Sequence, residues 1–381
     1  MEPLMRLQRI DYSEHVGSPQ EWKLVGLELG QRNLLVGKNA TGKSRTLNVI
    51  AGLARHLSGH PLAMTGTYAC VFKDGSRLYE YKYSIQNQEV ISEEIKVDSE
   101  TVLSRGQGGI GNIRAEKLGQ SLEFQTPPSS LAAVTRRDAI QHPFLEPLYR
   151  WASTLRHYTF GTQLGKEHFA ILVPGGRHAD DRDQNMVVGL FRLAFTKYGE
   201  IFTSSLIQDL AQAGYDIESI NIGAPISFDV SQSPGELVGL NVKETGMPGI
   251  TDQVSMSQGM FRVVSLLIHI NYCQLSNSGA TILVDDIGEG LDFDRSCKLI
   301  ELLRHKAEAS DVQLIMSTND RFVMNHVPLD EWSLLQRDKN TVRVRNAANS
   351  REIFESFRFT GLSNFSFLEM DFINTSEEVV H

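Results

Sequence analysis

The sequence predicts an α/β fold in which a phosphate-binding loop joins a buried strand to a helix. Residues 37–44 read GKNATGKS and match the pattern G-x-x-x-x-G-K-[ST] at every defined position. A mostly apolar run, 33–36, precedes the loop, as in a buried parallel strand. Apolar residues then recur at helical spacing, at Leu47, Ile50, Ala54 and Leu57. A second apolar run, 281–284, ends in two aspartates, so the chain has both halves of a P-loop NTPase.

The phosphate loop assigns a role to each of its residues. Gly37 and Gly42 allow the main chain to turn its N–H groups towards a phosphate, which the N-terminus of the following helix also attracts. Lys43 is expected to reach the β and γ phosphates of ATP, and the Ser44 hydroxyl to bind Mg²⁺. The predicted nucleotide-binding stretch comprises Gly37, Lys38, Asn39, Ala40, Thr41, Gly42, Lys43, Ser44 and Arg45.

Composition limits the class of protein. The 381 residues are 41% hydrophobic, enough for one elaborated domain or two lobes. Three cysteines without metal-type spacing fit a reducing cytosol, and no apolar stretch approaches the roughly 20 residues that span a bilayer. We therefore expect a cytoplasmic protein with no membrane partner. A net charge of -9 disfavours tight autonomous binding to nucleic acid but leaves DNA open as a partner.

The second apolar run carries the acidic half of the predicted site. It ends in Asp285 and Asp286, where a carboxylate can hold the Mg²⁺ shell and the next can polarise an attacking water. We assign Asp285 to the metal and Asp286 to the water.

A segment between these motifs carries a family resemblance. Residues 255–260 read SMSQGM and precede a stretch with helical apolar spacing. This segment resembles a degenerate L-S-G-G-Q signature of ABC-type ATPases, with Ser257 and Gly259 retained. The resemblance implies that Ser257 faces the γ-phosphate held by a partner subunit, in a homodimer or higher homo-oligomer of heads that close over ATP.

The resemblance also gives a role to Asn319. It follows a buried-strand run, 312–316, at a position where many ABC-type ATPases carry His, and Asp286 stands where Glu is usual. The predicted catalytic residues are therefore Lys43, Asp286 and Asn319. Because two of them depart from the family pattern, we expect slow turnover, with ATP acting more as a clamp than as fuel.

Spacing selects among the branches of this superfamily. Ser44 and Ser257 are 213 residues apart, too far for a transporter cassette, and the insertion has turn-forming clusters in place of coiled-coil heptads. Segments 180–194 and 238–246 resemble stand-alone ATP-binding proteins related to the ATPase half of OLD nucleases. That family implies an antiphage ATPase that regulates a separately encoded nuclease or toxin. The chain also resembles RecF recombination ATPases, which implies a DNA clamp as the alternative, and a non-hydrolysing scaffold is a third reading.

The remaining expectations concern organisation. We predict the first half of an ATPase head with an antiparallel β layer at 1–125, a mainly helical insertion lobe at 126–235, and the second half of the head at 236–381. Residues 144–158 are expected to form an amphipathic helix packed on the head. The Phe-rich tail, 351–372, either docks on the sheet or exposes an aromatic patch. Gln125 and Gln141 are the candidates for the glutamine that senses nucleotide in this superfamily.

Overall fold

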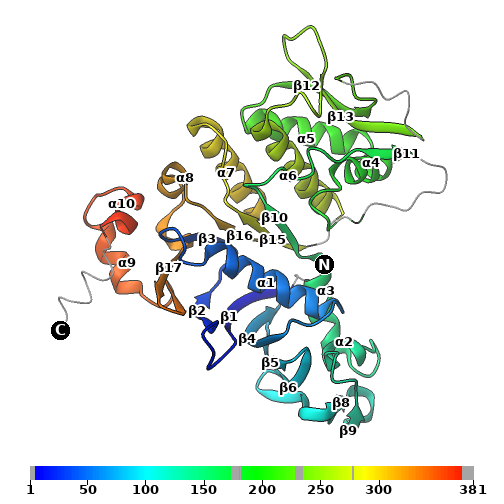
Figure 1. Cartoon of the computed structure of the whole chain (residues 1–381), viewed down its shortest axis with the longest axis vertical. Helices are drawn as coiled ribbons and strands as arrows, with labels where there is room; N and C mark the ends of the chain where they lie inside the picture. Colours follow the sequence, from blue (N-terminus) through cyan, green and yellow to red (C-terminus); the bar gives the residue numbers. More distant parts are fainter. Residues whose placement is uncertain (1–4, 173–179, 181, 228–234, 277–278, 371–381) are drawn as a thin grey trace.

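The computed structural model describes residues 5–172, 180, 182–227, 235–276 and 279–370. Its main sheet is 14-stranded and runs through most of the molecule (Figure 1). In spatial order the strands are β10 (Arg156–Thr159), β15 (Ala280–Asp285), β16 (Val312–Ser317), β3 (Arg32–Val36), β17 (Trp332–Asp338), β18 (Thr341–Asn346), β2 (Trp22–Glu28), β1 (Arg6–Glu14), β4 (Thr65–Asp74), β5 (Arg77–Gln86), β6 (Glu89–Val97), β7 (Glu100–Arg105), β8 (Ile110–Ala115) and β9 (Gln120–Gln125).

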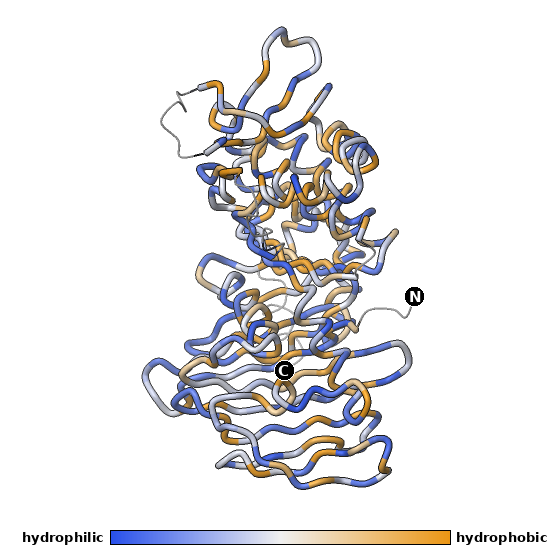
Figure 2. Tube along the Cα trace, turned by 90° about the vertical axis from the view of Figure 1, so that its right-hand side faces the viewer, coloured by the Kyte–Doolittle hydropathy of each residue, from blue (hydrophilic) through white to orange (hydrophobic). Residues whose placement is uncertain are grey.

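The sheet has a parallel part and an antiparallel part. Strands β10, β15, β16, β3 and β17 are parallel to their neighbours in that order, so their carboxyl ends share one edge. From β1 through β4 to β9 every pairing is antiparallel, as hairpins joined by short turns require. The antiparallel β layer predicted from alternating residues is therefore confirmed. Figure 2 shows that alternation, with hydrophilic and hydrophobic residues exchanging along the stacked strands in its lower half.

Helices cover both faces of the parallel part. Leu283 of β15 faces the core formed with α1 (Lys43–Leu57) and α3 (Glu146–Thr154). Its neighbours Ile282 and Val284 face the opposite core, with α6 (Gln258–Leu275) and α7 (Phe293–Glu308). This period of two along an apolar run is what burial on both faces of a strand produces.

A separate lobe stands above the sheet in Figure 1. Helices α4 (Val187–Tyr198) and α5 (Glu200–Gln212) pack against α6 there. A small sheet in the order β11 (Ala170–Leu172), β13 (Glu236–Glu244), β12 (Ile217–Gly223), with β14 (Thr251–Asp252) also paired to β13, completes the lobe. Helix α6 enters both the lobe and the core, so it links the two.

The last elements return to the core. After β16 come α8 (Arg321–His326), the hairpin of β17 and β18, and helices α9 (Arg351–Arg358) and α10 (Asn364–Glu369). Phe354, Phe357 and Phe367 are each 1% exposed and pack with the core, so this part of the tail docks, while Phe359 is 91% exposed. Phe372 lies outside the described residues. A short α2 (Ala132–Thr135) and four 3₁₀ turns, at Gln107–Gly109, Glu116–Leu118, Pro143–Leu145 and Leu329–Glu331, complete the described elements.

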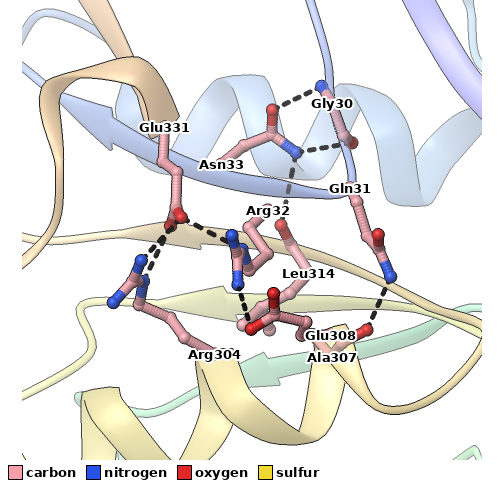
Figure 3. A network of polar contacts seen from close by, with 9 residues as sticks. All are labelled: Gly30, Gln31, Arg32, Asn33, Arg304, Ala307, Glu308, Leu314 and Glu331. Atoms are coloured by element: carbon pink, nitrogen blue, oxygen red, sulfur yellow. Dashed lines mark hydrogen bonds and ion pairs between the residues drawn. The ribbon is translucent and has the colours of Figure 1, made fainter.

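Polar contacts anchor the strand that leads into the phosphate loop (Figure 3). At the start of β3, Arg32 pairs with Glu331 (Nε to Oε1, 3.0 Å) and with Glu308 at the end of α7 (Nη1 to Oε2, 3.1 Å). Arg304 of α7 also pairs with Glu331, at 2.7 Å. Asn33 donates to the Leu314 carbonyl of β16 at 3.3 Å. These bonds hold β3 against α7 and β16 at the end remote from the predicted site.

The middle of the chain differs from the prediction in two respects. The expected helix at 144–158 ends at Thr154, because residues 156–159 form β10 and pair with β15 in the main sheet. The segment 126–235, predicted to be mainly helical, thus also supplies strands β10, β11 and β12. Trp151 of α3 donates to Thr281 of β15 at 2.9 Å and is buried, which confirms that this helix packs on the head. Among the described helices, none is both long and apolar enough to cross a membrane.

Candidate functional site

The phosphate loop is shaped by steric limits at its glycines. Strand β3 ends at Val36, the loop follows, and α1 begins at Lys43. A Cβ on Gly37 would stand 2.7 Å from Thr41 Oγ1 and 2.8 Å from the Leu335 carbonyl oxygen, so a larger residue does not fit. Gly42 has φ of 103°, in the left-handed region that favours glycine. Thr41 Oγ1 donates to the Lys38 carbonyl at 2.8 Å and closes the turn.

Lys43 lies inside this loop. Its Nζ donates to the carbonyls of Gly37, at 2.8 Å, and Lys38, at 3.3 Å, and the residue is 7% exposed. Burial lowers the pKa of the ammonium, while the carboxylates of Asp286 and Asp285 act in the opposite direction. The loop therefore holds a partly desolvated cation beside two carboxylates.

The acidic residues lie at the carboxyl edge of the parallel strands. Asp285 is the last residue of β15 and Ser317 the last of the adjacent β16. Ser317 Oγ donates to Asp285 Oδ1 and accepts from the Asp286 main-chain N–H at 3.0 Å. No sequence motif pointed to Ser317, because its contact with Asp285 spans 32 residues.

Asp286 has an unusual environment. Its φ of 55° places a non-glycine residue in the left-handed region. Asn319 Nδ2 donates to its Oδ1 at 3.0 Å. Burial, and next the charge of Asp285, raise the pKa of Asp286, which Lys43 and the Asn319 hydrogen bond only partly oppose. The fold thus brings Lys43, the Asp285–Asp286 pair and Asn319 from three separate segments into one site.

The rest of the predicted nucleotide stretch surrounds this cluster. Ser44 is exposed in the first turn of α1. Arg45 stacks over the Trp22 ring at 4.4 Å and pairs with Glu14, while the Ala40 carbonyl accepts from Arg337 at 3.1 Å. A glycine-lined loop at a helix N-terminus suits a phosphate, and the Ser44 hydroxyl with the Asp285 carboxylate offers the oxygen ligands that Mg²⁺ prefers. The residues present therefore fit a magnesium nucleotide.

The signature segment lies at the start of α6. Ser257 caps the helix by accepting from the Met260 N–H at 3.2 Å, and its side chain is otherwise exposed. A Cβ on Gly259 would stand 2.8 Å from the Gly290 carbonyl oxygen, so the helix lies directly against the loop that follows β15. Within the described residues, neither Ser257 nor Gly259 has a hydrogen bond to the phosphate loop of its own chain.

Arg262 joins this helix to two loops of the site. Its guanidinium donates to the carbonyls of Thr162 (2.8 Å), Gly161 (2.9 Å) and Glu289 (2.7 Å). Gly161 follows β10, and a Cβ there would stand 3.5 Å from Asp286 Cβ. Sequence reasoning missed Arg262, because all three acceptors are main-chain atoms distant in the chain.

The nucleotide-sensing glutamine requires a correction. Gln125 is in β9, at the opposite end of the main sheet from β10 and β15, and Gln141 lies beside Glu116 near that same end. Neither is at the carboxyl edge of β3, β16 and β15. Gln163 is exposed in the loop after β10 that also carries Gly161, and is a candidate at this edge. The strand assignment of 156–159 would have revealed it, since a loop that follows a parallel strand lies at this edge.

Comparison with known proteins supports the fold. No protein-family model and no curated protein matches the chain. A solved SMC head bound to the C-winged helix domain of ScpA aligns with a TM-score of 0.55 and 12% identity, over 91% of this chain and 99% of that one. An SMC head with an extended coiled coil, bound to the C-terminal domain of ScpA derived from Pyrococcus furiosus, aligns with a TM-score of 0.50 and 10% identity, over 93% and 100%. The fold is therefore that of an SMC head domain.

Proposed function

We propose that the chain is a magnesium-dependent, ATP-binding ABC-type ATPase. The observation that carries this proposal is the convergence of Lys43, Asp285, Asp286 and Asn319 at the shared edge of β3, β16 and β15. Lys43 and the loop N–H groups would hold the phosphates, and Ser44 with Asp285 the Mg²⁺ ion, which would neutralise phosphate charge. Asp286, whose raised pKa favours accepting a proton, would orient and deprotonate the attacking water.

Slow hydrolysis is part of this proposal. The Asp286 side chain is one methylene shorter than the usual Glu, and Asn319, which donates to its Oδ1, stands where His is usual. A base with a shorter reach is less well placed for proton transfer from the water. We expect ATP to stabilise a closed state that lasts longer than a rapid turnover cycle would allow.

The closed state would contain two copies of the chain. Ser257 Oγ caps its helix by accepting one hydrogen bond, and the residue is exposed. Within the described residues it makes no hydrogen bond to the phosphate loop of its own chain. By the resemblance to ABC-type heads, this serine would lie against the nucleotide of a second copy. ATP would then bridge two heads, and hydrolysis would release them.

The finer proposal is that this cycle regulates a separately encoded nuclease or toxin in antiphage defence. It rests on the sequence resemblance to ATP-binding relatives of the OLD nucleases. In the described part of the chain, everything after β16 completes the head: β17 and β18 enter the main sheet, and α9 and α10 pack on its core. In this proposal the effector chemistry comes from a separately encoded protein.

Two measurements test these steps. Isothermal titration with ATP and Mg²⁺ should show binding to the unaltered protein and its loss in Lys43→Ala, whereas Lys298→Ala, which loses only an exposed ion pair, should bind normally. Absence of binding to the unaltered protein would refute the ATPase assignment.

The second measurement is mass spectrometry of proteins that co-purify with tagged Asp286→Ala in the presence of ATP. The exposed Asp294→Asn is the control. Recovery of a stoichiometric nuclease or toxin with Asp286→Ala would support the regulatory role. Recovery of recombination proteins with DNA, and no effector, would refute it in favour of a RecF-like clamp.

A further inference from the structure

The last strand of the main sheet, β9, leaves one edge open. It pairs with β8 alone, and all its residues except Phe124 are exposed. At the other end of the sheet β10 is only four residues long, and the Gln184 side chain accepts from its Thr159 N–H at 2.8 Å. The two ends of the sheet therefore differ, since β9 presents a longer and more exposed edge than β10.

β9 also lacks several of the devices that usually protect an edge strand. Its sequence, QSLEFQ, contains no Lys and no Pro, and its pairing with β8 has no bulge, although the pairings of β1 and β6 do. A regular edge without these features is a template for pairing with another strand. Its one charge is Glu123, so any partner strand must avoid placing a carboxylate opposite it.

Register identifies which main-chain groups point outward. The Thr126 N–H donates to the Gly109 carbonyl at 3.0 Å, and the ladder continues with Phe124 opposite Gly111 and Leu122 opposite Ile113. Because hydrogen bonding alternates along an antiparallel strand, even-numbered residues of β9 bond to β8 and odd-numbered residues point outward. Arg136 confirms this direction, since it donates to the outward carbonyl of Gln125. Ser121 and Glu123 carry the outward groups that remain.

We propose that β9 pairs antiparallel with β9 of a second copy of the chain, with the two-fold axis at Leu122. In this register Ser121 of each copy exchanges main-chain hydrogen bonds with Glu123 of the other, and Gln120 lies opposite Phe124. Centring the axis on Glu123 would instead oppose two carboxylates and require the Gln125 carbonyl that Arg136 occupies. The strand is thus self-complementary in one register.

The same register covers exposed apolar surface. Leu122 is 38% exposed, and its side chain lies on the same face of the strand as the buried Phe124. Pairing about Leu122 brings the two leucines together and extends the apolar face across the two-fold axis. A contact of one short strand is small, so we expect a dissociation constant weaker than about 1 µM. This interface needs no nucleotide and is separate from the ATP-dependent contact proposed above.

Disulfide trapping in the full-length, nucleotide-free protein tests the register. Leu122→Cys would place two thiols in a non-hydrogen-bonded pair with Cα atoms about 4.5 Å apart, within the range that a disulfide bridges. Gln120→Cys is the matched control, because its two copies would be about 13 Å apart along the strands. The native cysteines, Cys70, Cys273 and Cys297, are buried. We expect Leu122→Cys to form the covalent dimer at least about tenfold faster than the control.

A second pair of variants tests the main-chain hydrogen bonds. Ser121→Pro, added to Leu122→Cys, removes an outward N–H while leaving the bonds to β8 intact, and should abolish the rapid crosslinking. Ser121→Ala keeps that N–H and should crosslink as before. Equal rates for Leu122→Cys and Gln120→Cys would overturn the proposal, whether or not the proline variant folds. Equal crosslinking of folded Ser121→Pro and Ser121→Ala would also overturn it.

Discussion

His269 should make the protein's stability depend on pH in a predictable way. It lies in α6, is 1% exposed, and contacts the Tyr158 ring of β10 with 4.9 Å between ring centroids. Within the described structure, neither ring nitrogen has a hydrogen-bond partner. Burial, and secondarily the charge of Arg156, lowers the pKa of His269 from 6.5 to about 3. The folded protein therefore keeps this ring neutral at pH values where the unfolded chain protonates it.

The sign and size of the effect follow from proton linkage. Because the unfolded state binds more protons between the two pKa values, this contribution to stability is complete above pH 6.5 and is lost as the pH falls towards 3. Between pH 7.5 and 5.5, the free energy of unfolding should fall by about 1.3 kcal/mol because of this residue. His269→Leu fills similar space without a titrating ring and should remove that part of the pH dependence.

Urea unfolding at both pH values measures the difference. The unaltered protein and His269→Leu share every other titrating group, including the buried His56. The difference between their free energies of unfolding therefore changes from pH 7.5 to pH 5.5 only through His269. His305→Gln, an exposed position in α7, is the control and should behave as the unaltered protein does. If His269→Leu loses as much stability between pH 7.5 and 5.5 as the unaltered protein, the reasoning is wrong.

Three further variants probe the site and its supports. Asn319→Leu removes the hydrogen bond to Asp286 and should slow ATP hydrolysis by about tenfold, measured in single-turnover experiments. Its ATP affinity, measured by titration, should change by less than about twofold. Arg262→Met loses three bonds to main-chain carbonyls and should lower the free energy of unfolding in urea by about 2–4 kcal/mol, whereas Lys298→Met should leave it within about 0.5 kcal/mol. Glu93→Gln leaves the buried Arg105 without its counter-charge and should lower the free energy of unfolding by about 3–5 kcal/mol. Glu94 is less buried, so Glu94→Gln should have little effect, and equal losses for the two variants would contradict this reading.

The predicted parts of the fold were those encoded in short windows of sequence. The strand, loop and helix around Lys43 follow from local glycine spacing and apolar periodicity, and so does the strand that ends at Asp285. The β layer was visible because strands β4, β5 and β6 alternate over nine or ten residues each. These features need no knowledge of distant contacts.

The missed parts depend on contacts between distant segments. Four residues, 156–159, continue an amphipathic helical pattern, and only their pairing with β15 makes them a strand. Gln163 was overlooked because the loop that carries it becomes part of the site only through that pairing. Ser317 and Arg262 act through main-chain or single side-chain partners 27 or more residues away, for which one sequence contains no periodic signal.

The arrangement around Arg262 shows how the lobe and the site constrain one another. The residue belongs to α6, which packs against α4 and α5 of the lobe, yet its guanidinium bonds to loops that follow β10 and β15. Gly259, one turn earlier, leaves no space between α6 and the Gly290 carbonyl. A movement of α6 relative to β15 must therefore either break these bonds or displace the loop beside Asp286. Because a close-packed contact of this kind does not deform continuously, a change at the lobe and a change at Asp286 cannot be independent.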